Sequence, residues 1–269
     1  MKDQMMRRSI AFLVVLVILI YTNDSFGQDS VEHRTLFPKG ITVAYGLGNY
    51  AVCDEYVSQE KYAGTLPYFR IDRSHFHNIY GFRQKLEYRN SSQINNNNIS
   101  ANITEFSFYM DYLYPACKFK LFSIPVFTFI GPTANLFFYL NNPGYMEGSI
   151  HLNYSFVLMF SSGFTSEFII PVKKGLQIEN SVSLSLLSLG LRMPELIEPK
   201  DKSDDSQSPA KLLSPLSGLN GTVNLGIRYY CCRFLSAKLN YRFHLLSIRE
   251  WYPVLSSSDN LILALTYHF

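Results

Sequence analysis

The feature that most constrains the fold is an alternation of apolar and polar residues with a period of two. Side chains at positions i and i+2 lie on the same face of a β-strand, so each such segment predicts a strand with one apolar face. The pattern is present at residues 176–186, 222–230 and 237–246, and it is clearest at the C-terminus. One face of that last segment consists of Leu261, Leu263, Leu265, Tyr267 and Phe269.

The alternation predicts ten strands, of which two are less regular. Pro67 lies in the second and Gly131-Pro132 lies in the fifth, and proline cannot donate a hydrogen bond to a neighbouring strand. The predicted strands lie near residues 40–54, 61–72, 78–90, 103–114, 124–140, 150–170, 175–192, 219–230, 235–248 and 259–269.

The segments between the predicted strands are short and long in turn. Those after even-numbered strands are short and include Pro115-Ala116-Cys117, Lys173-Lys174-Gly175 and Cys231-Cys232-Arg233. Short turns at one end and long loops at the other are typical of outer-membrane β-barrels. The longer, polar segments follow odd-numbered strands at residues 90–102, 141–149, 193–218 and 250–258.

Composition separates such a barrel from a soluble β-sandwich, which shares the alternation. Charged residues make up 17% of the chain and aromatic residues 15%, whereas soluble domains average about 25% charged residues. The predicted strands are long enough for a tilted crossing, and Tyr and Phe recur near their ends, as in interfacial girdles. We therefore predict an all-β fold, a transmembrane antiparallel up-and-down barrel at 40–269. The net charge of +3 is too small to indicate nucleic-acid binding.

The N-terminus has the features of an export signal. Lys2, Arg7 and Arg8 precede an apolar run from Ile10 to Tyr21, and Ser25 and Gly27 are small residues at the spacing that signal peptidase prefers. The run is shorter than the ~20 residues of a transmembrane helix. We expect a signal peptide at 1–27, a periplasmic segment at 28–39 and a location outside the cytoplasm.

Three further segments carry a resemblance: Ile103–Tyr114 leading into a turn, Phe129-Ile130-Gly131-Pro132, and the terminal Leu265-Thr266-Tyr267-His268-Phe269. With the export signal, they make the sequence resemble the small outer-membrane β-barrel proteins of Gram-negative bacteria, especially the PorT-like and related families of Bacteroidetes. The resemblance implies periplasmic termini and recognition of Phe269 by the barrel assembly machinery. These families often have eight strands, which is the alternative to ten, and they do not share one activity.

Charged residues gather on the faces opposite the apolar ones, which would face the lumen. Both signs are present on several strands, so we expect a network of ion pairs. A ten-stranded barrel is not much wider than the eight-stranded kind that side chains fill, whereas open channels have about 16 strands. This predicts a plugged lumen, with a narrow pore or ligand pocket as the alternative. The predicted network comprises Arg83, Lys85, Glu87, Arg89, Glu105, Asp111, Glu179, Arg228, Lys238 and Arg242, with His244 on the same faces.

Few residues indicate catalysis or ligand binding. A rim-located hydrolase would use paired carboxylates and a histidine, and Asp204-Asp205 and His151 lie in or near predicted outer loops, but no Asp-x-Asp or Asp-x-His pair lies at one strand end. The sequence contains no zinc-ligand spacing and no phosphate-binding loop, so we expect no cofactor or metal. Cys117 could form a disulfide with Cys231 or Cys232, since all three lie in predicted turns.

The sequence thus predicts a non-enzymatic outer-membrane barrel with a structural, surface-binding or secretion-associated role. Its specificity would lie in outer loops such as 193–218 and 90–102. The alternatives are a narrow passive pore for small solutes and, less well supported, the rim hydrolase. The expected partners are outer-membrane lipid and the assembly machinery, while the sequence identifies no surface or secretion partner, solute or oligomeric state.

Overall fold

The computed structural model describes residues 39–55, 58–76, 80–95, 100–122, 124–143, 155–192, 210–250 and 253–269. The chain divides into two units, Met1–Arg34 and Thr35–Phe269, and all described residues belong to the second. The predicted export signal and the segment at 28–38 lie outside the described residues. The strands are β1 (Gly40–Asp54), β2 (Ser58–Phe76), β3 (Gly81–Asn95), β4 (Ser100–Leu121), β5 (Ile124–Pro143), β6 (Ser155–Lys173), β7 (Leu176–Arg192), β8 (Ala210–Leu213), β9 (Gly218–Cys232), β10 (Leu235–Ile248) and β11 (Val254–His268).

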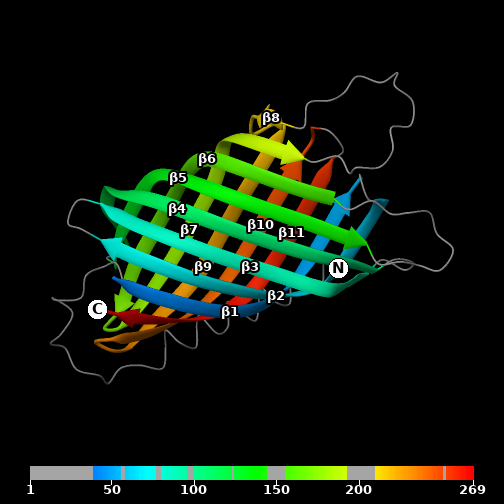
Figure 1. Cartoon of the computed structure of the whole chain (residues 1–269). Coiled ribbons are helices and arrows are strands. Elements are labelled where there is room, and N and C mark those ends of the chain that lie inside the picture. The colour runs from blue at the N-terminus through cyan, green and yellow to red at the C-terminus, as the bar shows by residue number, and fades with distance from the viewer. Residues whose placement is uncertain are drawn as a thin grey trace, which may run out of the picture. The chain divides into compact units, whose positions relative to one another are not determined.

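Ten of these strands close into an antiparallel barrel. Neighbours in sequence pair with each other, β7 pairs with β9, and β1 closes the ring by pairing with β11 from Gly40↔His268 to Asp54↔Val254. Figure 1 shows the strands side by side around the barrel. The predicted fold class and the ten strands are therefore confirmed, and the eight-stranded alternative is wrong.

The short strand β8 was not predicted. It lies within the segment that the sequence predicted as the loop 193–218, and it pairs with Ser188–Leu191 at the end of β7. At this level β9 has left β7, and the hydroxyl of Ser185 accepts a hydrogen bond from the Asn220 N–H (2.9 Å) and donates one to the Asn220 carbonyl (3.0 Å). A side chain thus substitutes for the backbone ladder where the two strands separate.

The two ends of the barrel differ as expected. The tight turns β6–β7, at Lys174-Gly175, and β9–β10, at Arg233-Phe234, lie at the end that also holds Gly40 and His268, which we call the turn end. The opposite end, where β8 lies, we call the loop end. Pro115-Ala116-Cys117 is not a turn, because β4 continues to Leu121 and ends as a two-stranded ribbon with the first residues of β5. From residue 114 onward β4 is exposed, whereas Val126, Thr128 and Phe129 of β5 are buried.

The outer surface of the barrel is apolar and its interior is largely polar. On β1 and β11 the outward residues are 46–59% exposed, whereas the inward Thr42, Ala44, Ile262 and Ala264 are at most 6% exposed. A closed ladder with an apolar outer band is the β-structure that can cross a hydrocarbon layer, since no backbone group is left unpaired at an edge. No helix in the described ranges is long and apolar enough to span a membrane. The outward residues are Ile41, Val43, Tyr45, Leu47, Leu261, Leu263, Leu265 and Tyr267.

Both prolines that weakened the sequence prediction lie within continuous strands. Pro67 pairs with Leu47 of β1, and the register with β3 on its other side is interrupted between Ala63 and Tyr68. The β4–β5 pairs pass from Asp111↔Thr133 to Tyr114↔Ile130 around Gly131-Pro132. A proline is tolerated where its strand makes no ladder hydrogen bond.

The predicted disulfide is wrong. Cys117 lies on β4, whereas Cys231 and Cys232 lie on β9, and β5, β6 and β7 stand between those strands around the ring. Neighbouring strands are about 4.8 Å apart, so the separation greatly exceeds the ~7 Å between Cα atoms that a disulfide can bridge. Cys117, Cys231 and Cys232 are all free.

Candidate functional site

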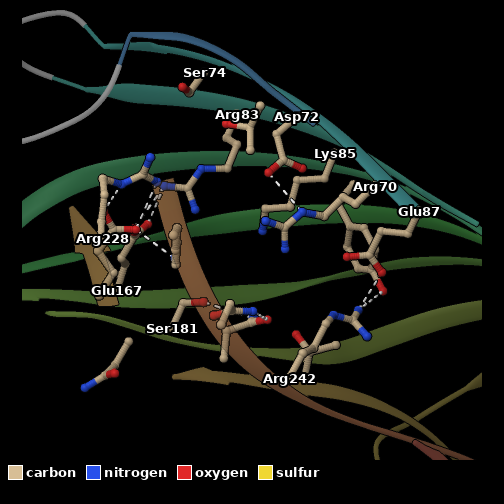
Figure 2. Close-up of a pocket in the computed structure, with 18 residues that line it drawn as sticks. Arg70, Asp72, Ser74, Arg83, Lys85, Glu87, Glu167, Ser181, Arg228 and Arg242 are labelled. Carbon is tan, nitrogen blue, oxygen red and sulfur yellow. Dashed lines mark hydrogen bonds and ion pairs between the residues drawn. The ribbon is translucent and has the colours of Figure 1, made fainter. Parts of the chain in front are cut away.

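The candidate site is the charged middle of the lumen. Because side chains alternate along each strand, every second residue of β2, β3, β4, β6, β7, β9 and β10 points inward, and charged side chains occupy many of these positions. Figure 2 shows the labelled charged side chains from several strands converging on one hollow. The network built by these residues has three parts.

In the first part, one carboxylate forms ion pairs with two cations. Glu179 on β7 binds Arg228 of β9 through both carboxylate oxygens and Lys238 of β10 through Oε2, with Lys238 Nζ at 2.7 Å. Arg228 also donates to the hydroxyls of Ser236 (2.9 Å) and Thr266 (2.8 Å). The Arg228 guanidinium therefore links its own strand, β9, to β7, β10 and β11.

The second part links β3 to β6 and to β4. Arg83 Nη2 donates to both oxygens of Glu167 on β6, at 2.7 and 3.0 Å. The next inward residue, Lys85, places Nζ 2.6 Å from Asp111 Oδ2 on β4, and the Thr133 hydroxyl donates to Asp111 Oδ1 at 2.7 Å. Asp111 is completely buried, so these donors replace the water that an ionised carboxylate requires.

The third part crosses the barrel. Arg242 of β10 donates to Glu87 of β3 at 2.6 Å, and its side chain is 2% exposed. Arg89 binds Glu105, which also accepts a hydrogen bond from the Tyr50 hydroxyl at 2.6 Å. His244, another predicted inward residue, lies with Nδ1 3.4 Å from Arg89 Nη1 and Nε2 3.0 Å from Asn220 Oδ1.

The structure therefore places all ten residues of the predicted network in the lumen, and each lies in an ion pair. Sequence reasoning missed Arg70, Asp72 and Glu167. Arg70 and Asp72 form an ion pair along β2 (Nε to Oδ2, 3.0 Å). Both alternate with the outward Phe69 and Ile71, so the period-two rule would have found them had Pro67 not weakened that strand.

The network leaves little free space. It surrounds a cavity of about 40 Å³, which is room for roughly three water molecules, since each needs about 10–15 Å³. Among its lining residues are Arg70, Arg83, Glu167, Arg228 and Arg242, shown in Figure 2. The described residues thus fill the middle of the barrel with ion pairs and leave no wide channel there.

Towards the loop end the lumen is filled by apolar side chains, which we call the apolar plug. Its members are at most 1% exposed, although their outward neighbours Asn49 and Lys61 are exposed and polar. At this end the described interior is largely apolar, with the buried Asp54–Arg192 ion pair (2.7 Å) lying among these side chains. The plug consists of Tyr50, Val52, Tyr62, Leu66, Ile94, Ala101, Ile103, Phe137, Tyr139, Val157, Met159, Leu213, Leu246, Ile248 and Val254.

The other predicted residues lie elsewhere. Phe269 is at the turn end and 57% exposed, and its N–H donates to the Lys39 carbonyl at 3.4 Å. His151, Asp204 and Asp205, the candidates for a rim hydrolase, lie outside the described residues. Within the described ranges, no group of three or more His, Cys, Asp or Glu residues could hold a metal ion.

Comparison with known proteins gives structural similarity alone. The chain matches no protein-family model and no curated protein. Among solved structures it resembles the Neisserial surface protein A (12% identity, 87% of this chain and 99% of that one, TM-score 0.40). It also resembles the outer membrane protease OmpT from Escherichia coli (8%, 89% and 100%, 0.47) and Ail, the attachment invasion locus protein of Yersinia pestis (8%, 86% and 99%, 0.29). At these identities the similarity concerns the fold and not the activity.

Proposed function

We propose that this protein is a closed, non-enzymatic outer-membrane barrel that acts through its outer loops, in a structural, surface-binding or secretion-associated role. The observation that carries the proposal is the filling of the lumen at two levels. Ion pairs leave a cavity of about 40 Å³ in the middle, and the apolar plug fills the loop end with side chains that are at most 1% exposed. A barrel without a water path can present loops and walls but cannot pass solutes.

The orientation belongs to the same proposal. Long loops of outer-membrane barrels face outward and tight turns face the periplasm, so the loop end would be outside and both termini in the periplasm. The exposed Phe269 would then be available to the barrel assembly machinery. Membership of the PorT-like group is part of this proposal too, supported by the terminal segment Leu265–Phe269.

Conductance tests the closed lumen. We expect the purified barrel to give no stepwise current in planar lipid bilayers, because side chains fill the lumen at both levels. The double variant Phe137→Ala/Tyr139→Ala should show flickering current or solute leakage, since both side chains are fully buried in the plug.

The control for conductance is an outward pair of the same kind. Tyr45→Ala/Tyr88→Ala removes aromatic rings that are 56% and 43% exposed on the outer wall. This variant should give no current. Stable open channels in the unmodified protein would refute the closed lumen and support the passive pore instead.

Cysteine labelling tests the orientation. Cys231 and Cys232 are exposed at the turn end, so a membrane-impermeant maleimide should leave them unmodified in intact cells and modify them once the outer membrane is permeabilised. A Ser100→Cys variant places a thiol at an exposed position of the loop end and should react in intact cells. The reverse labelling pattern would invert the proposed orientation.

A further inference from the structure

The exposed charges at the turn end have one sign. In the described residues this end carries seven outer cations, whereas the described aspartates and glutamates lie in the lumen or at the loop end. At the loop end, by contrast, Lys61, Lys211 and Arg249 are balanced by carboxylates, including Glu250, which binds Lys211 at 3.1 Å. The seven cations, which we call the basic ring, are Lys39, Arg73, Lys118, Lys120, Lys173, Lys174 and Arg233.

Two members of the basic ring lie over exposed aromatic rings at the turn end. The Lys39 ammonium is 5.7 Å from the centre of the Phe269 ring, and the Arg233 guanidinium is 5.7 Å from that of Phe234. The Lys118 ammonium lies 4.8 Å from the centre of the Phe127 ring, which packs on the inner face against Phe129 and Ile169. Phe234 and Phe269 are more than half exposed. Aromatic rings with a cation beside them are typical of the level where hydrocarbon meets lipid headgroups.

The ribbon at the end of β4 and β5 extends this arrangement. Tyr114, Cys117 and Phe119 pair with Ile130, Thr128 and Val126, which are two residues apart on β5, so the bulge near Ala116 keeps Phe119 on the outer apolar face. Lys118 and Lys120 alternate with Phe119 and therefore lie on the opposite face of the ribbon. The ribbon thus has an apolar outer face, and its two lysines lie near its end. A single lysine side chain is built in the same way, with an apolar stem in hydrocarbon and a charged head among the headgroups.

We propose that the basic ring binds the anionic headgroups of a phospholipid leaflet and so couples the turn end of the barrel to that leaflet. If these cations were ordinary solvated surface charge, positive charge need not be concentrated at one end of the barrel. Nor would cations need to lie over exposed aromatic rings. Lysine or arginine near an anionic membrane surface strengthens binding by about fivefold for each residue. Seven cations around the rim are therefore enough to favour anionic over zwitterionic lipid.

The test is the lipid selectivity of the folded full barrel in phosphatidylcholine vesicles. Electron spin resonance with spin-labelled phosphatidylglycerol or phosphatidylcholine measures which lipid is held at the protein surface. We expect phosphatidylglycerol to be preferred by about fivefold at low salt and less at 1 M salt, where the Debye length is about 3 Å. The double variant Lys118→Gln/Lys120→Gln should lower the preference at least twofold, and adding Lys173→Gln/Lys174→Gln should bring it close to one.

The matched control removes the same charge from the other end. Lys61→Gln/Arg249→Gln changes two exposed cations of the loop end and should leave the preference unchanged, with heat-modifiability on detergent gels showing that every variant is folded. The proposal is refuted if the unmodified barrel shows no preference, which would favour an acidic protein partner, or if the loop-end variant loses as much selectivity as the turn-end variant. A conducting barrel with intact selectivity would refute only the closed lumen.

Discussion

Replacing Glu179 with glutamine is expected to lower the free energy of unfolding by about 3–5 kcal/mol, the cost of breaking a buried ion pair by removing one partner. The effect is large because Glu179 is 4% exposed and is the carboxylate bound by both Arg228 and Lys238. The amide keeps the shape but not the charge, so two cations lose their counter-ion inside the barrel. Urea titration in phospholipid vesicles, followed by circular dichroism, measures the loss.

Two further variants decide whether burial is the cause. Glu250→Gln removes a carboxylate that also binds a lysine, but its side chain is 41% exposed, and pairs of that kind contribute about 1 kcal/mol or less. Adding Lys238→Met to Glu179→Gln should restore part of the lost stability, because it removes a buried ammonium group that has lost its counter-ion. If Glu250→Gln lowered the free energy of unfolding as much as Glu179→Gln, burial in the lumen would not be the reason for the large effect.

Replacing Gly131 with alanine is expected to be comparably severe, with a loss of at least about 3 kcal/mol or failure to fold, because overpacking that displaces backbone costs 1–3 kcal/mol or more. A Cβ atom on Gly131 would overlap with the carbonyl oxygen and carbon of Tyr112 on the neighbouring strand. Those atoms belong to the backbone and cannot rotate away. The yield of heat-modifiable barrel, together with urea titration of any folded fraction, measures the effect.

Gly221 provides the matched control, since it is also a glycine within a barrel strand. A Cβ atom there would meet Leu184 Cδ1 at 3.6 Å and the Ser183 carbonyl oxygen at 3.8 Å, which are ordinary contacts. Gly221→Ala should therefore change stability by less than about 1 kcal/mol, with a gain from the lower entropy of the unfolded chain. Equal losses at the two positions would show that strand glycines matter here for a reason other than close backbone approach.

The alternation in the sequence was sufficient to predict the ten barrel strands and most of the inward charges. At Leu261–Phe269 or Arg83–Arg89 each residue's face follows from its parity alone, because neighbouring side chains point to opposite faces. Parity does not tell which inward charges meet. Arg242 and Glu87 are 155 residues apart in sequence and Arg83 and Glu167 are 84 apart, and their contact depends on the strand number and stagger of the closed barrel.

One ambiguous segment and one misreading have physical reasons. The segment 124–140 reads as apolar on both faces because Phe137 and Tyr139 belong to the apolar plug, while outward residues such as Leu136 face the membrane. Pro115-Ala116-Cys117 reads as a turn because proline is typical of turns. The structure instead ends β4 at Leu121 and places Phe122 at the tip with a φ of 48°, a conformation that sequence rules assign to glycine or asparagine.

The two levels of the lumen should also respond differently to temperature. Attraction between apolar groups weakens on cooling, because their hydration carries a large heat capacity, whereas ion pairs do not depend on that term. Cold should therefore loosen the loop end, where Phe137, Val157 and Val254 are packed among the other apolar side chains of the plug, before it affects the ion pairs around Glu179. An organism living near freezing would require a different filling at that end, while the charged middle could stay as it is.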